Sequence, residues 1–419
     1  MAKEEKKSMS VLDACKVLNT RFKKATGGKA NILTEASAMP ECKRFSMGTM
    51  SADYALYGGM ALGKIISFSG EEGSGKSLAS VQAMAKYQQD YPDRTCVYVD
   101  AEGTLPGQWE WMVRMTGLDV SPEKFQRLDC CGLSAEQIFG IINTLENTDN
   151  IGLIILDSAP ALISQDDIKS IEEQDDFEKD NGQRASIAKP LAKFCRIMQL
   201  KLARQGNSLI IINHLRIAGK AHNGAIIYEE PCGHALKFYP SIKIRFAKKS
   251  FTKGDDLEVK KSDADVDGIC LTFSVTKSRL GPTNRPGAKL VYRYETGLDT
   301  FFDLVSIITE HEIAERVNAQ TWALVDPNTK ERYKDENGEE LVFRGKANMI
   351  NYLKEHDDFR AMYEQVVNGY INDTGINISL VDKDLFNKLL DEDELMNDPD
   401  KKFYGDELNN MSDGSEDEE

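Results

Sequence analysis

One eight-residue motif limits what this chain can fold into more than any other feature. Residues 70–77 read Gly-Glu-Glu-Gly-Ser-Gly-Lys-Ser and match the phosphate-binding pattern GxxxxGK[ST] without a gap. The apolar segment 65–69 precedes the motif, and a helix-like segment follows it, as a P-loop requires. The glycines let backbone N–H groups turn toward a phosphate, and the helix adds its positive end. The motif therefore predicts an α/β nucleotide-binding protein.

The residues of this loop have different expected tasks. Lys76 should reach the β- and γ-phosphates, and the Ser77 hydroxyl should complete a Mg²⁺ shell. We therefore expect ATP and Mg²⁺ as cofactors. The predicted nucleotide-binding residues are Gly70, Glu71, Glu72, Gly73, Ser74, Gly75, Lys76, Ser77 and Leu78.

A second motif supports the metal site. In residues 151–158 four consecutive apolar residues lead to Asp157, the form of a Walker B strand. Asp157 would then hold Mg²⁺ through water at the carboxyl end of a central strand. The competing interpretation is an aspartate that caps the next helix. The P-loop favours the metal role, so Ser77 and Asp157 are the predicted metal residues.

The order of apolar segments predicts the rest of the core. Buried strands alternate with amphipathic helices, which indicates a mostly parallel central sheet. Strands are expected at 65–69, 96–100, 153–157, 209–213, 242–247, 269–276 and 290–294. Helices are expected at 76–90, 105–116, 134–147 and 186–205. The last three strands leave no room for helices between them and should form an antiparallel extension.

Two smaller units and a tail should flank this core. A helix is expected at 8–24, where Val11, Cys15, Leu18 and Phe22 recur at helical spacing. A small α/β unit is expected at 307–390, with helices near 349–354 and 359–367. The expected organisation is 1–43 as N-terminal helix and linker, 44–306 as ATPase core, 307–390 as small C-terminal domain and 391–419 as acidic disordered tail.

Charge is distributed unevenly along the chain. The net charge is −16, but the last 29 residues hold 13 acidic residues against two lysines. The bulk charge therefore neither argues for nucleic-acid binding nor excludes it. The tail has little apolar periodicity, so we expect it to be disordered.

Cysteine spacing and hydropathy narrow the class of protein. The eight cysteines include no CxxC pair, and the five histidines show no ligand spacing, so we expect reduced packing cysteines and no zinc site. No apolar run has the length of a membrane span or a signal peptide. We therefore expect a cytoplasmic protein.

Hydrolysis of ATP needs a group that orients water. Asp100 and Glu102 follow a strand that should neighbour the P-loop strand, and either carboxylate could polarise the attacking water. The sequence does not choose between them, and a capping role competes for each. Asn213 and His214 end another strand at the same edge, where His214 could sense the γ-phosphate or serve a structural role.

Several further segments, in order along the chain, resemble the RecA recombinase family, especially its phage-type, UvsX-like members. The resemblance runs from about 45 to 304 and more faintly to about 370. The segments that carry it are 45–56 (FSMGTMSADYAL), 98–102 (YVDAE), 156–158 (LDS), 212–216 (INHLR), 233–239 (GHALKFY), 277–279 (KSR) and 344–348 (RGKAN).

The resemblance implies roles for the residues around the nucleotide. Glu102 becomes the catalytic carboxylate, and His214 becomes the γ-phosphate sensor, where most members have Gln and the phage-type members have His. In this family ATP lies between neighbouring subunits of a helical filament. Lys277 and Arg279 would reach the γ-phosphate of the next subunit, and the 8–24 helix would dock on the adjacent copy. From the residues alone, a solvated basic turn competes with this role for Lys277 and Arg279.

The resemblance also implies two DNA-binding loops and a duplex-guiding C-terminal domain. The second loop, at about 216–234, holds Arg216, Lys220 and His222 among small residues, suited to a phosphate backbone. The first loop, at 165–184, departs from the family because acidic residues outnumber basic ones, which favours gating or partner contact over DNA contact. The predicted DNA-binding residues are Lys189, Lys193 and Arg196 on one helical face, Arg216, Lys220 and Lys346.

The predicted function is a DNA-dependent ATPase that forms filaments on single-stranded DNA and catalyses homologous pairing and strand exchange in recombination and repair. Expected partners are single-stranded DNA, homologous duplex DNA, further copies of the chain and ssDNA-binding or mediator proteins. One alternative is a hexameric RecA-fold helicase or motor. The other is a non-catalytic, nucleotide-gated protein that coats single-stranded DNA.

Overall fold

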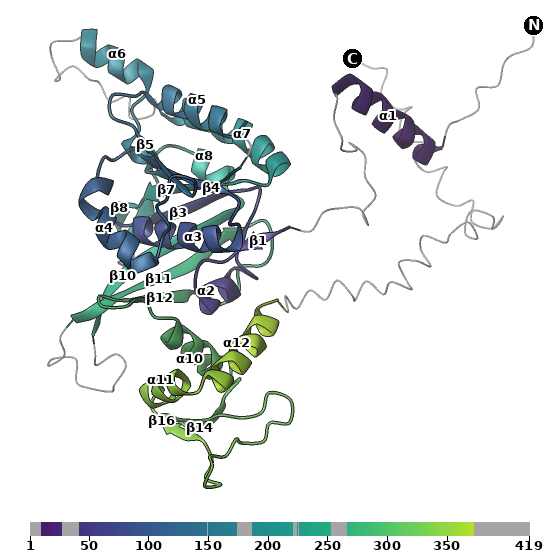
Figure 1. The fold of residues 1–419 in the computed structure, drawn as a ribbon. Coiled ribbons are helices and arrows are strands. Elements are labelled where there is room, and N and C mark those ends of the chain that lie inside the picture. Colours follow the sequence, from purple (N-terminus) through teal and green to yellow (C-terminus); the bar gives the residue numbers. More distant parts are fainter. Residues whose placement is uncertain are drawn as a thin grey trace, which may run out of the picture.

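A nine-stranded sheet forms the centre of the described chain (Figure 1). The structure is a computed structural model and describes residues 10–26, 42–148, 150–173, 187–220, 224, 226–252 and 266–372. The strand order is β13-β12-β11-β10-β3-β7-β6-β4-β5. The strands are β3 (Ile65–Gly70), β4 (Thr95–Asp100), β5 (Phe125–Asp129), β6 (Ile151–Asp157), β7 (Ser208–His214), β10 (Ile242–Thr252), β11 (Val266–Ser278), β12 (Ala288–Arg293) and β13 (Gly297–Leu298).

The pairing confirms a mostly parallel sheet with an antiparallel extension. The six strands from β10 to β5 pair in parallel, whereas β11, β12 and β13 add antiparallel to β10. All seven predicted strands are present. The edge strand β5 was not predicted, because only Phe125 is buried and the other four residues are polar or partly exposed. Polar edge strands lack the apolar run by which a central strand is found.

Two pairs of helices cover the two faces of the sheet. The helices α3 (Lys76–Asp90) and α4 (Leu105–Thr116) share a core with Ile66 and Phe68 of β3. On the other face α5 (Ala135–Leu145) and α7 (Ala188–Gln205) share a core with Ile65. Successive residues of one strand therefore point into different cores, as the pleat requires. These four helices confirm the sequence prediction.

The strand register brings four segments to one edge of the sheet. Gly70 at the end of β3 pairs with His214 at the end of β7, and Asp100 at the end of β4 pairs with Asp157 at the end of β6. In an open parallel sheet, ligands bind at the carboxyl ends of the strands. The P-loop, both predicted carboxylate strands and the predicted sensor therefore meet where a nucleotide is expected.

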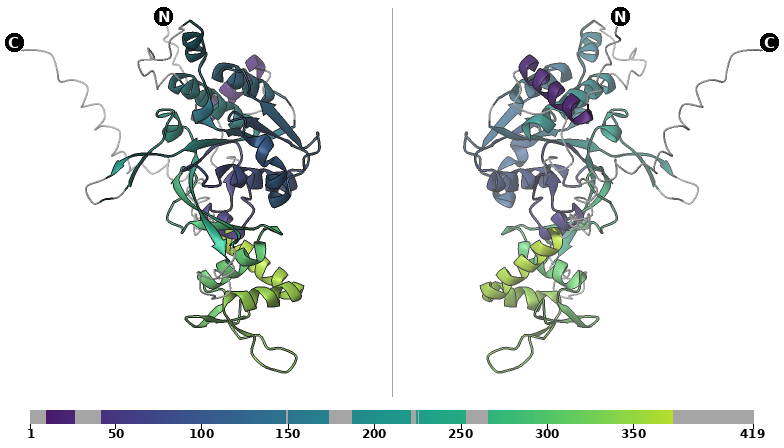
Figure 2. Two further views of the ribbon diagram at one scale, coloured as in Figure 1. Left: turned by 90° about the vertical axis from the view of Figure 1, so that its left-hand side faces the viewer. Right: turned by 90° about the vertical axis from the view of Figure 1, so that its right-hand side faces the viewer.

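A second unit lies below the sheet in Figure 1, and both views of Figure 2 show it at the same end of the core. It combines α10 (Thr300–Glu310), the three-stranded sheet β14 (Glu315–Asn318), β15 (Thr321–Ala323) and β16 (Val342–Arg344), and the helices α11 (Lys346–Glu355) and α12 (Asp357–Asn372). Both helices predicted here are present. The expected boundary between 306 and 307 falls inside α10, whose Phe302, Val305 and Ile308 pack into the core of this unit.

The N-terminal helix α1 spans Val11–Thr26, slightly later than expected. Its apolar side chains Val11, Leu12 and Leu18 are exposed. An exposed apolar face on a helix indicates a surface that a partner covers. The described residues do not include 1–9, 27–41, 373–390 or the acidic tail at 391–419.

Short elements complete the described chain. They are β1 (Arg44–Phe45), β2 (Met60–Ala61), α2 (Met50–Ala55), η2 (Ala159–Ala161), α6 (Gln165–Glu173), β8 (Arg216–Lys220), β9 (Ile226–Glu229) and α8 (Ala235–Phe238). All eight cysteines are described and free, and five of them are buried. No helix among the described residues has the length and apolar character to cross a membrane.

Two aspartates, the partly buried Asp53 and the buried Asp303, hold α2 at the junction of the core and the C-terminal unit. Asp53 accepts hydrogen bonds from Ser46 Oγ at 2.5 Å and Met47 N at 2.8 Å. Asp303 of α10 accepts from Met50 N at 2.6 Å and from the Ser51 hydroxyl. Burial raises the pKa of Asp53 to about 7 and that of Asp303 to about 6. Both carboxyls are therefore more easily protonated in the folded chain than in the unfolded one.

These raised pKa values predict that the fold is less stable at neutral pH than at mildly acidic pH. A carboxyl whose pKa is raised by folding stabilises the fold below its unfolded value near 4, and this contribution is lost as pH rises through its folded pKa. The free energy of unfolding should therefore fall by about 2 kcal/mol or more between pH 5 and pH 8, at about 1.4 kcal/mol per pKa unit. Urea denaturation at the two pH values measures it. Asp53→Asn should flatten this dependence, and the exposed Asp93→Asn should not; an unchanged slope in Asp53→Asn would contradict the assignment.

Candidate nucleotide site

The P-loop is shaped by a left-handed glycine and a lysine folded over the loop. Gly75 caps α3 with φ of +83°, and a Cβ there would lie 2.4 Å from the Leu271 side chain, so only glycine fits. Lys76 Nζ donates to the carbonyl oxygens of Glu71 at 2.7 Å and Gly70 at 3.2 Å. Burial lowers the pKa of Lys76. An ammonium held by neutral carbonyls is available for exchange with a stronger anionic partner such as a phosphate.

Ser77 and Asp157 meet as the sequence predicted. Ser77 Oγ donates to Asp157 Oδ2 at 2.6 Å, and Tyr98 OH donates to the same oxygen at 2.5 Å. Burial raises the pKa of Asp157. Mg²⁺ prefers oxygen ligands and is held by one or two protein groups together with phosphates and water. The hydroxyl and carboxylate fit that ion, and the described residues contain no larger cluster of metal-ligating side chains.

Geometry separates the two candidate carboxylates. The buried Asp100 forms an ion pair with Arg127 at 2.7 Å and accepts a hydrogen bond from Gly103 N at 2.9 Å. Glu102 instead accepts from Ser158 Oγ at 2.5 Å and lies 2.9 Å from His214 Nε2. Asp100 is therefore committed to holding the chain, whereas Glu102 faces the site.

Electrostatics agree with this separation. The hydrogen bond with His214 is the main cause that lowers the pKa of Glu102, and Ser158 adds to it against the effect of burial. A lowered pKa keeps the carboxylate ionised at neutral pH, the state in which it can polarise a water molecule. Glu102 thus has the position and the charge state that hydrolysis requires.

A cavity of about 350 Å³ runs along the P-loop on the side of Glu102. It is lined by Glu72, Gly73, Gly75, Lys76, Ser77, Leu78, Glu102, Thr104, Gln108, Trp111, Met112, His214, Lys248 and Ile269. Six of the nine predicted nucleotide residues line it, and Gly70, Glu71 and Ser74 do not. Sequence reasoning missed the wall from α4, where Trp111 is 36% exposed while Trp109 packs inward. The available signal was the spacing of Trp109 and Trp111: residues two positions apart lie on different faces of a helix, so one of the two had to point away from the core.

The sensor strand continues directly into the second loop. Asn213 is buried, its Oδ1 accepts from His214 N at 3.0 Å, and its Nδ2 lies 3.5 Å from the Pro231 carbonyl. Two residues later β8 begins at Arg216. The contact between Glu102 and His214 is therefore also a contact between the nucleotide cavity and the base of this loop.

The second loop is an antiparallel hairpin rather than irregular chain, which corrects the sequence prediction. Strands β8 and β9 pair from Arg216↔Glu229 to Lys220↔Ile226. Glycines within 216–234 concealed the strands, although Ile217, Ile226 and Ile227 are residues of high strand propensity. These isoleucines are exposed, as are Arg216 and Lys220. His222 lies outside the described residues.

The other predicted DNA contacts are placed separately. Lys189, Lys193 and Arg196 are all exposed on α7. The first half of the first loop forms the helix α6 instead of a loop, and residues 174–186 lie outside the described chain. Ser164 accounts for the helix start, because its Oγ accepts a hydrogen bond from Asp167 N at 3.1 Å, and Ile168 and Ile171 follow at the helical spacing i,i+3.

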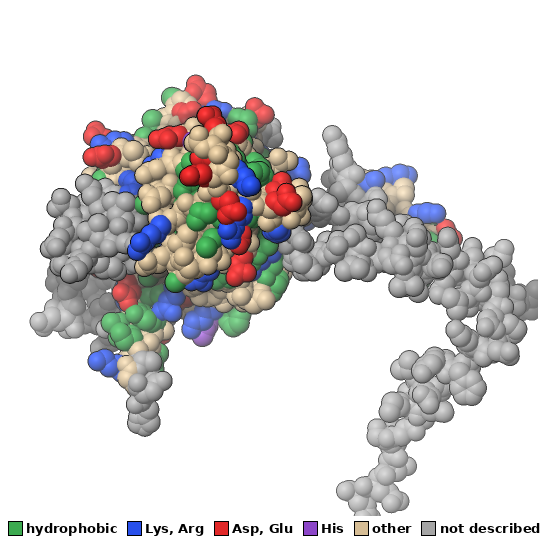
Figure 3. Space-filling view, turned by 90° about the horizontal axis from the view of Figure 1, so that it is seen from below, with side chains coloured by type: hydrophobic (Ala, Val, Ile, Leu, Met, Phe, Trp, Pro, Cys, Tyr) green, Lys and Arg blue, Asp and Glu red, His purple; other side chains and the backbone are tan. Residues whose placement is uncertain are grey.

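Lys346 stands at the first position of α11 and lies 3.3 Å from the Glu310 carboxylate. This cation therefore has an acidic partner on α10. On the face seen from below in Figure 3, acidic and basic side chains are interspersed rather than gathered by sign. The C-terminal unit therefore shows no face of one charge sign in this view, and the role of Lys346 in guiding DNA stays a prediction.

Lys277 and Arg279 lie at the edge of the sheet opposite the P-loop. Ser278 pairs with Ile242, which pairs with Ile66 at the start of β3, whereas the P-loop follows the end of that strand. At about 3.3 Å per residue, β3 separates the two edges by roughly 13 Å. Lys277 Nζ donates to the Phe238 carbonyl at 2.9 Å, and the Arg279 guanidinium donates to the same oxygen. Neither cation reaches the nucleotide cavity of its own chain.

Comparison with known proteins gives one consistent result. Residues 14–292 match the family model described as the RecA N-terminal domain. Protein RecA of Malacoplasma penetrans (strain HF-2) is 26% identical over 322 residues, which cover 76% of this chain and 84% of that relative. The matched region includes the P-loop, both carboxylate strands, the hairpin and β11, and ends within β12.

The separation of the two carboxylates is testable by stability. Asp100→Asn should lower the free energy of unfolding by about 2–4 kcal/mol, because it removes the buried carboxylate that pairs with Arg127 and leaves that cation only the longer contact with Asp129 at 3.6 Å. Glu102→Gln should change it by less than about 1 kcal/mol, since Glu102 and His214 are each about one quarter exposed and such pairs add little net stability. Denaturant titration of both variants measures the difference. A larger loss in Glu102→Gln than in Asp100→Asn would reverse the assignment.

Proposed function

The chain belongs to the RecA family, and on that premise we propose that it is a DNA-dependent ATPase that forms ATP-gated filaments on single-stranded DNA. Within these filaments it catalyses homologous pairing and strand exchange. The observation that carries the proposal is the contact of Glu102 with His214 at the base of an exposed hairpin whose strand β8 presents Arg216 and Lys220. It joins a nucleotide cavity to a surface suited to DNA. The histidine at this position supports assignment to the phage-type, UvsX-like branch.

The proposed hydrolysis uses residues of one chain around the phosphates. Lys76 exchanges its carbonyl partners for the β- and γ-phosphates, and Ser77 and Asp157 hold Mg²⁺, which neutralises phosphate charge. Glu102 orients the attacking water. Ser158 and His214 fix the Glu102 carboxylate from two sides, so the base is positioned before substrate arrives.

The proposed gating uses the same carboxylate. His214 bonds either to Glu102 or to the γ-phosphate, and the exchange moves the chain that leads into β8. ATP and DNA thereby influence each other's binding through one contact. Arg216 and Lys220 of the hairpin, together with Lys189, Lys193 and Arg196 of α7, supply the exposed cations that neutralise DNA phosphates. Lys346 contributes from the C-terminal unit after leaving Glu310.

The proposed filament completes the site with a second copy of the chain. Lys277 and Arg279 lie too far from their own cavity, so the nucleotide they can contact is one bound to a neighbouring copy. The exposed apolar face of α1 supplies an additional contact on that neighbour. A ring-shaped helicase would use the same cations, and electron micrographs separate the two assemblies.

The central test is ATP hydrolysis with and without single-stranded DNA. The wild type should show DNA-stimulated turnover, and Glu102→Gln should lower it by a factor of about 10² to 10⁴, the usual contribution of a general base. Negative-stain micrographs of the same samples should show helical filaments on DNA. Glu312→Gln, a change of a glutamate remote from the cavity, is the control. Turnover indifferent to DNA, or closed rings, would reject the recombinase; negligible turnover in every protein would favour the coating protein.

Completion of the site by a neighbour predicts complementation between two inactive variants. Lys76→Ala loses the phosphate contact of its own cavity, and Lys277→Ala/Arg279→Ala loses the contribution to the neighbour. Each alone should have at most about one hundredth of wild-type turnover, the scale on which removal of one transition-state contact acts. A mixture should recover a measurable fraction, because some interfaces combine an intact P-loop with intact cations. If the turnover of the mixture equals the sum of the turnovers of the two variants measured separately, the cations do not act across the interface.

A further inference from the structure

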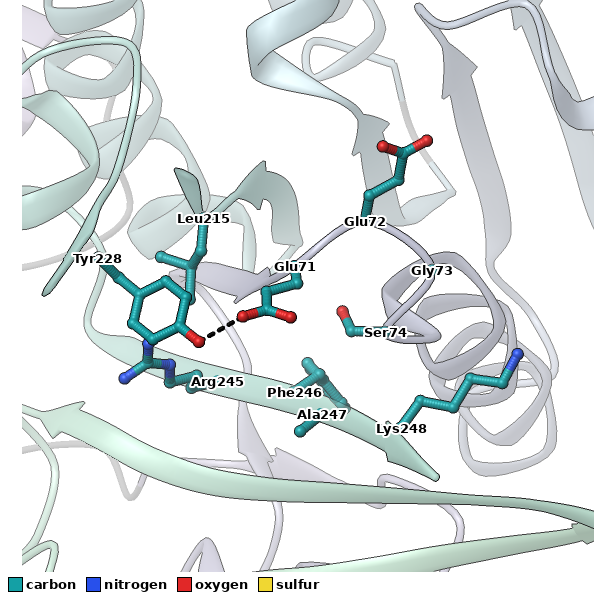
Figure 4. A pocket seen from close by; sticks show the side chains of 10 residues that line it. All are labelled: Glu71, Glu72, Gly73, Ser74, Leu215, Tyr228, Arg245, Phe246, Ala247 and Lys248. Carbon is teal, nitrogen blue, oxygen red and sulfur yellow. Dashed lines mark hydrogen bonds between the residues drawn. The ribbon is translucent and has the colours of Figure 1, made fainter. Parts of the chain in front are cut away.

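A second cavity lies on the other side of the P-loop, between this loop, the hairpin and β10. It has a volume of about 500 Å³ and is lined by Glu71, Glu72, Gly73, Ser74, Leu215, Tyr228, Arg245, Phe246, Ala247 and Lys248 (Figure 4). At one end of it the Tyr228 hydroxyl of β9 donates a hydrogen bond to Glu71 Oε1 of the P-loop. The Arg245 guanidinium lies 4.4 Å from the centre of the Tyr228 ring. Hydrolysis as proposed above uses none of these three side chains.

Glu71 connects this contact to the phosphate-reading lysine. Its side chain accepts from Tyr228, while its backbone carbonyl accepts from Lys76 Nζ at 2.7 Å. Glu71 lines the second cavity and not the nucleotide cavity, whereas Glu72 lines both. One residue of the P-loop therefore touches both Lys76 and the hairpin.

The base of the hairpin is fixed independently of Tyr228. Glu230, directly after β9, forms a largely buried ion pair with Lys243 of β10 at 2.7 Å. Pro231 is held by Asn213 at 3.5 Å. Since these contacts fix the end of β9, loss of the Tyr228 hydroxyl should loosen the exposed strands without unfolding the base.

We propose that Tyr228 is a positioning residue that ties strand β9 of the hairpin to the P-loop through Glu71. It forms a second connection between the nucleotide and DNA sites, beside the one from Glu102 to His214 at the start of β8. Both strands of the hairpin therefore respond when nucleotide binds. This inference rests on the proposed function for the nature of the ligands, but the contact itself does not depend on DNA.

The connection works through the partners of Lys76. When Lys76 leaves the Glu71 carbonyl for a phosphate, the peptide at Glu71 loses a charged donor and the loop is free to shift. The side chain of Glu71, and with it the Tyr228 contact, shifts too. Because coupling between two sites is reciprocal, displacement of β9 by DNA changes nucleotide affinity by the same factor. The ring of Tyr228 contacts Arg245, and only its hydroxyl contacts Glu71, so the hydroxyl alone connects β9 to the P-loop.

Tyr228→Phe removes that hydroxyl and keeps the ring. The test compares the affinity for single-stranded oligo-dT, by fluorescence anisotropy, with and without a non-hydrolysable ATP analogue and Mg²⁺. The ratio of the two affinities should fall about fivefold in Tyr228→Phe, the effect expected from one charge-assisted hydrogen bond at a half-exposed site. Tyr294→Phe, an exposed tyrosine at the far edge of the sheet, should keep the wild-type ratio. A wild-type ratio in Tyr228→Phe would overturn the proposal.

Amide hydrogen exchange tests the contact without DNA. In the nucleotide-free protein, exchange at 226–229 should be about fivefold faster in Tyr228→Phe than in the wild type, with 242–246 unchanged. Glu71→Ala should speed exchange similarly, and Glu71→Ala/Tyr228→Phe should add little, because both changes break one contact. Additive effects, or none, would overturn the proposal. Altered exchange in a protein whose DNA binding ignores nucleotide would support the contact and reject the recombinase instead.

Discussion

The register of the parallel strands is the constraint on which the rest of the molecule depends. Gly70 pairs with His214 and Asp100 with Asp157, so four segments that are far apart in sequence end in one row. A shift of one residue in any pair would turn the alternate side chains into the wrong core, since the two faces of each strand fill different cores. Core packing on both faces therefore fixes the position of every polar group at the nucleotide edge.

Along this edge the strong and the weak interactions are separated. The Asp100 carboxylate is buried against Arg127, a pair that is costly to break and therefore holds the chain. Glu102 and His214 are each about one quarter exposed, and pairs of that kind contribute little net stability. A contact of low net strength can be exchanged for a phosphate without loss of the fold. The site can thus change partners at Glu102, His214 and Lys76 while Asp100 holds the strand end in place.

Much of the fold and of the nucleotide site was predictable from the sequence, because central strands are continuous apolar runs and the P-loop is a contiguous motif. All seven predicted strands and the four core helices are present, with α3 and α4 at the predicted ends. The sequence could not choose between Asp100 and Glu102, because the choice depends on Arg127, which only the pairing of β4 with β5 brings close. The polar edge strand β5, the hairpin hidden among glycines and the Trp111 wall were missed for related reasons. Each depends on which face a tertiary neighbour covers, and local patterns do not contain that information.

The hairpin also connects the two edges of the sheet. It begins after His214 and is followed by α8, and the carbonyl oxygens of Lys237 and Phe238 at the end of α8 hold Lys277 and Arg279. Burial, with the neighbouring Arg279, lowers the pKa of Lys277, so this cation gains from an anionic partner in place of neutral carbonyls. One end of the hairpin thus contacts the chain's own nucleotide cavity, and the other contacts the cations proposed to serve a neighbour. In a filament, movement of one hairpin would then affect two successive nucleotide sites, which would make neighbouring subunits respond together.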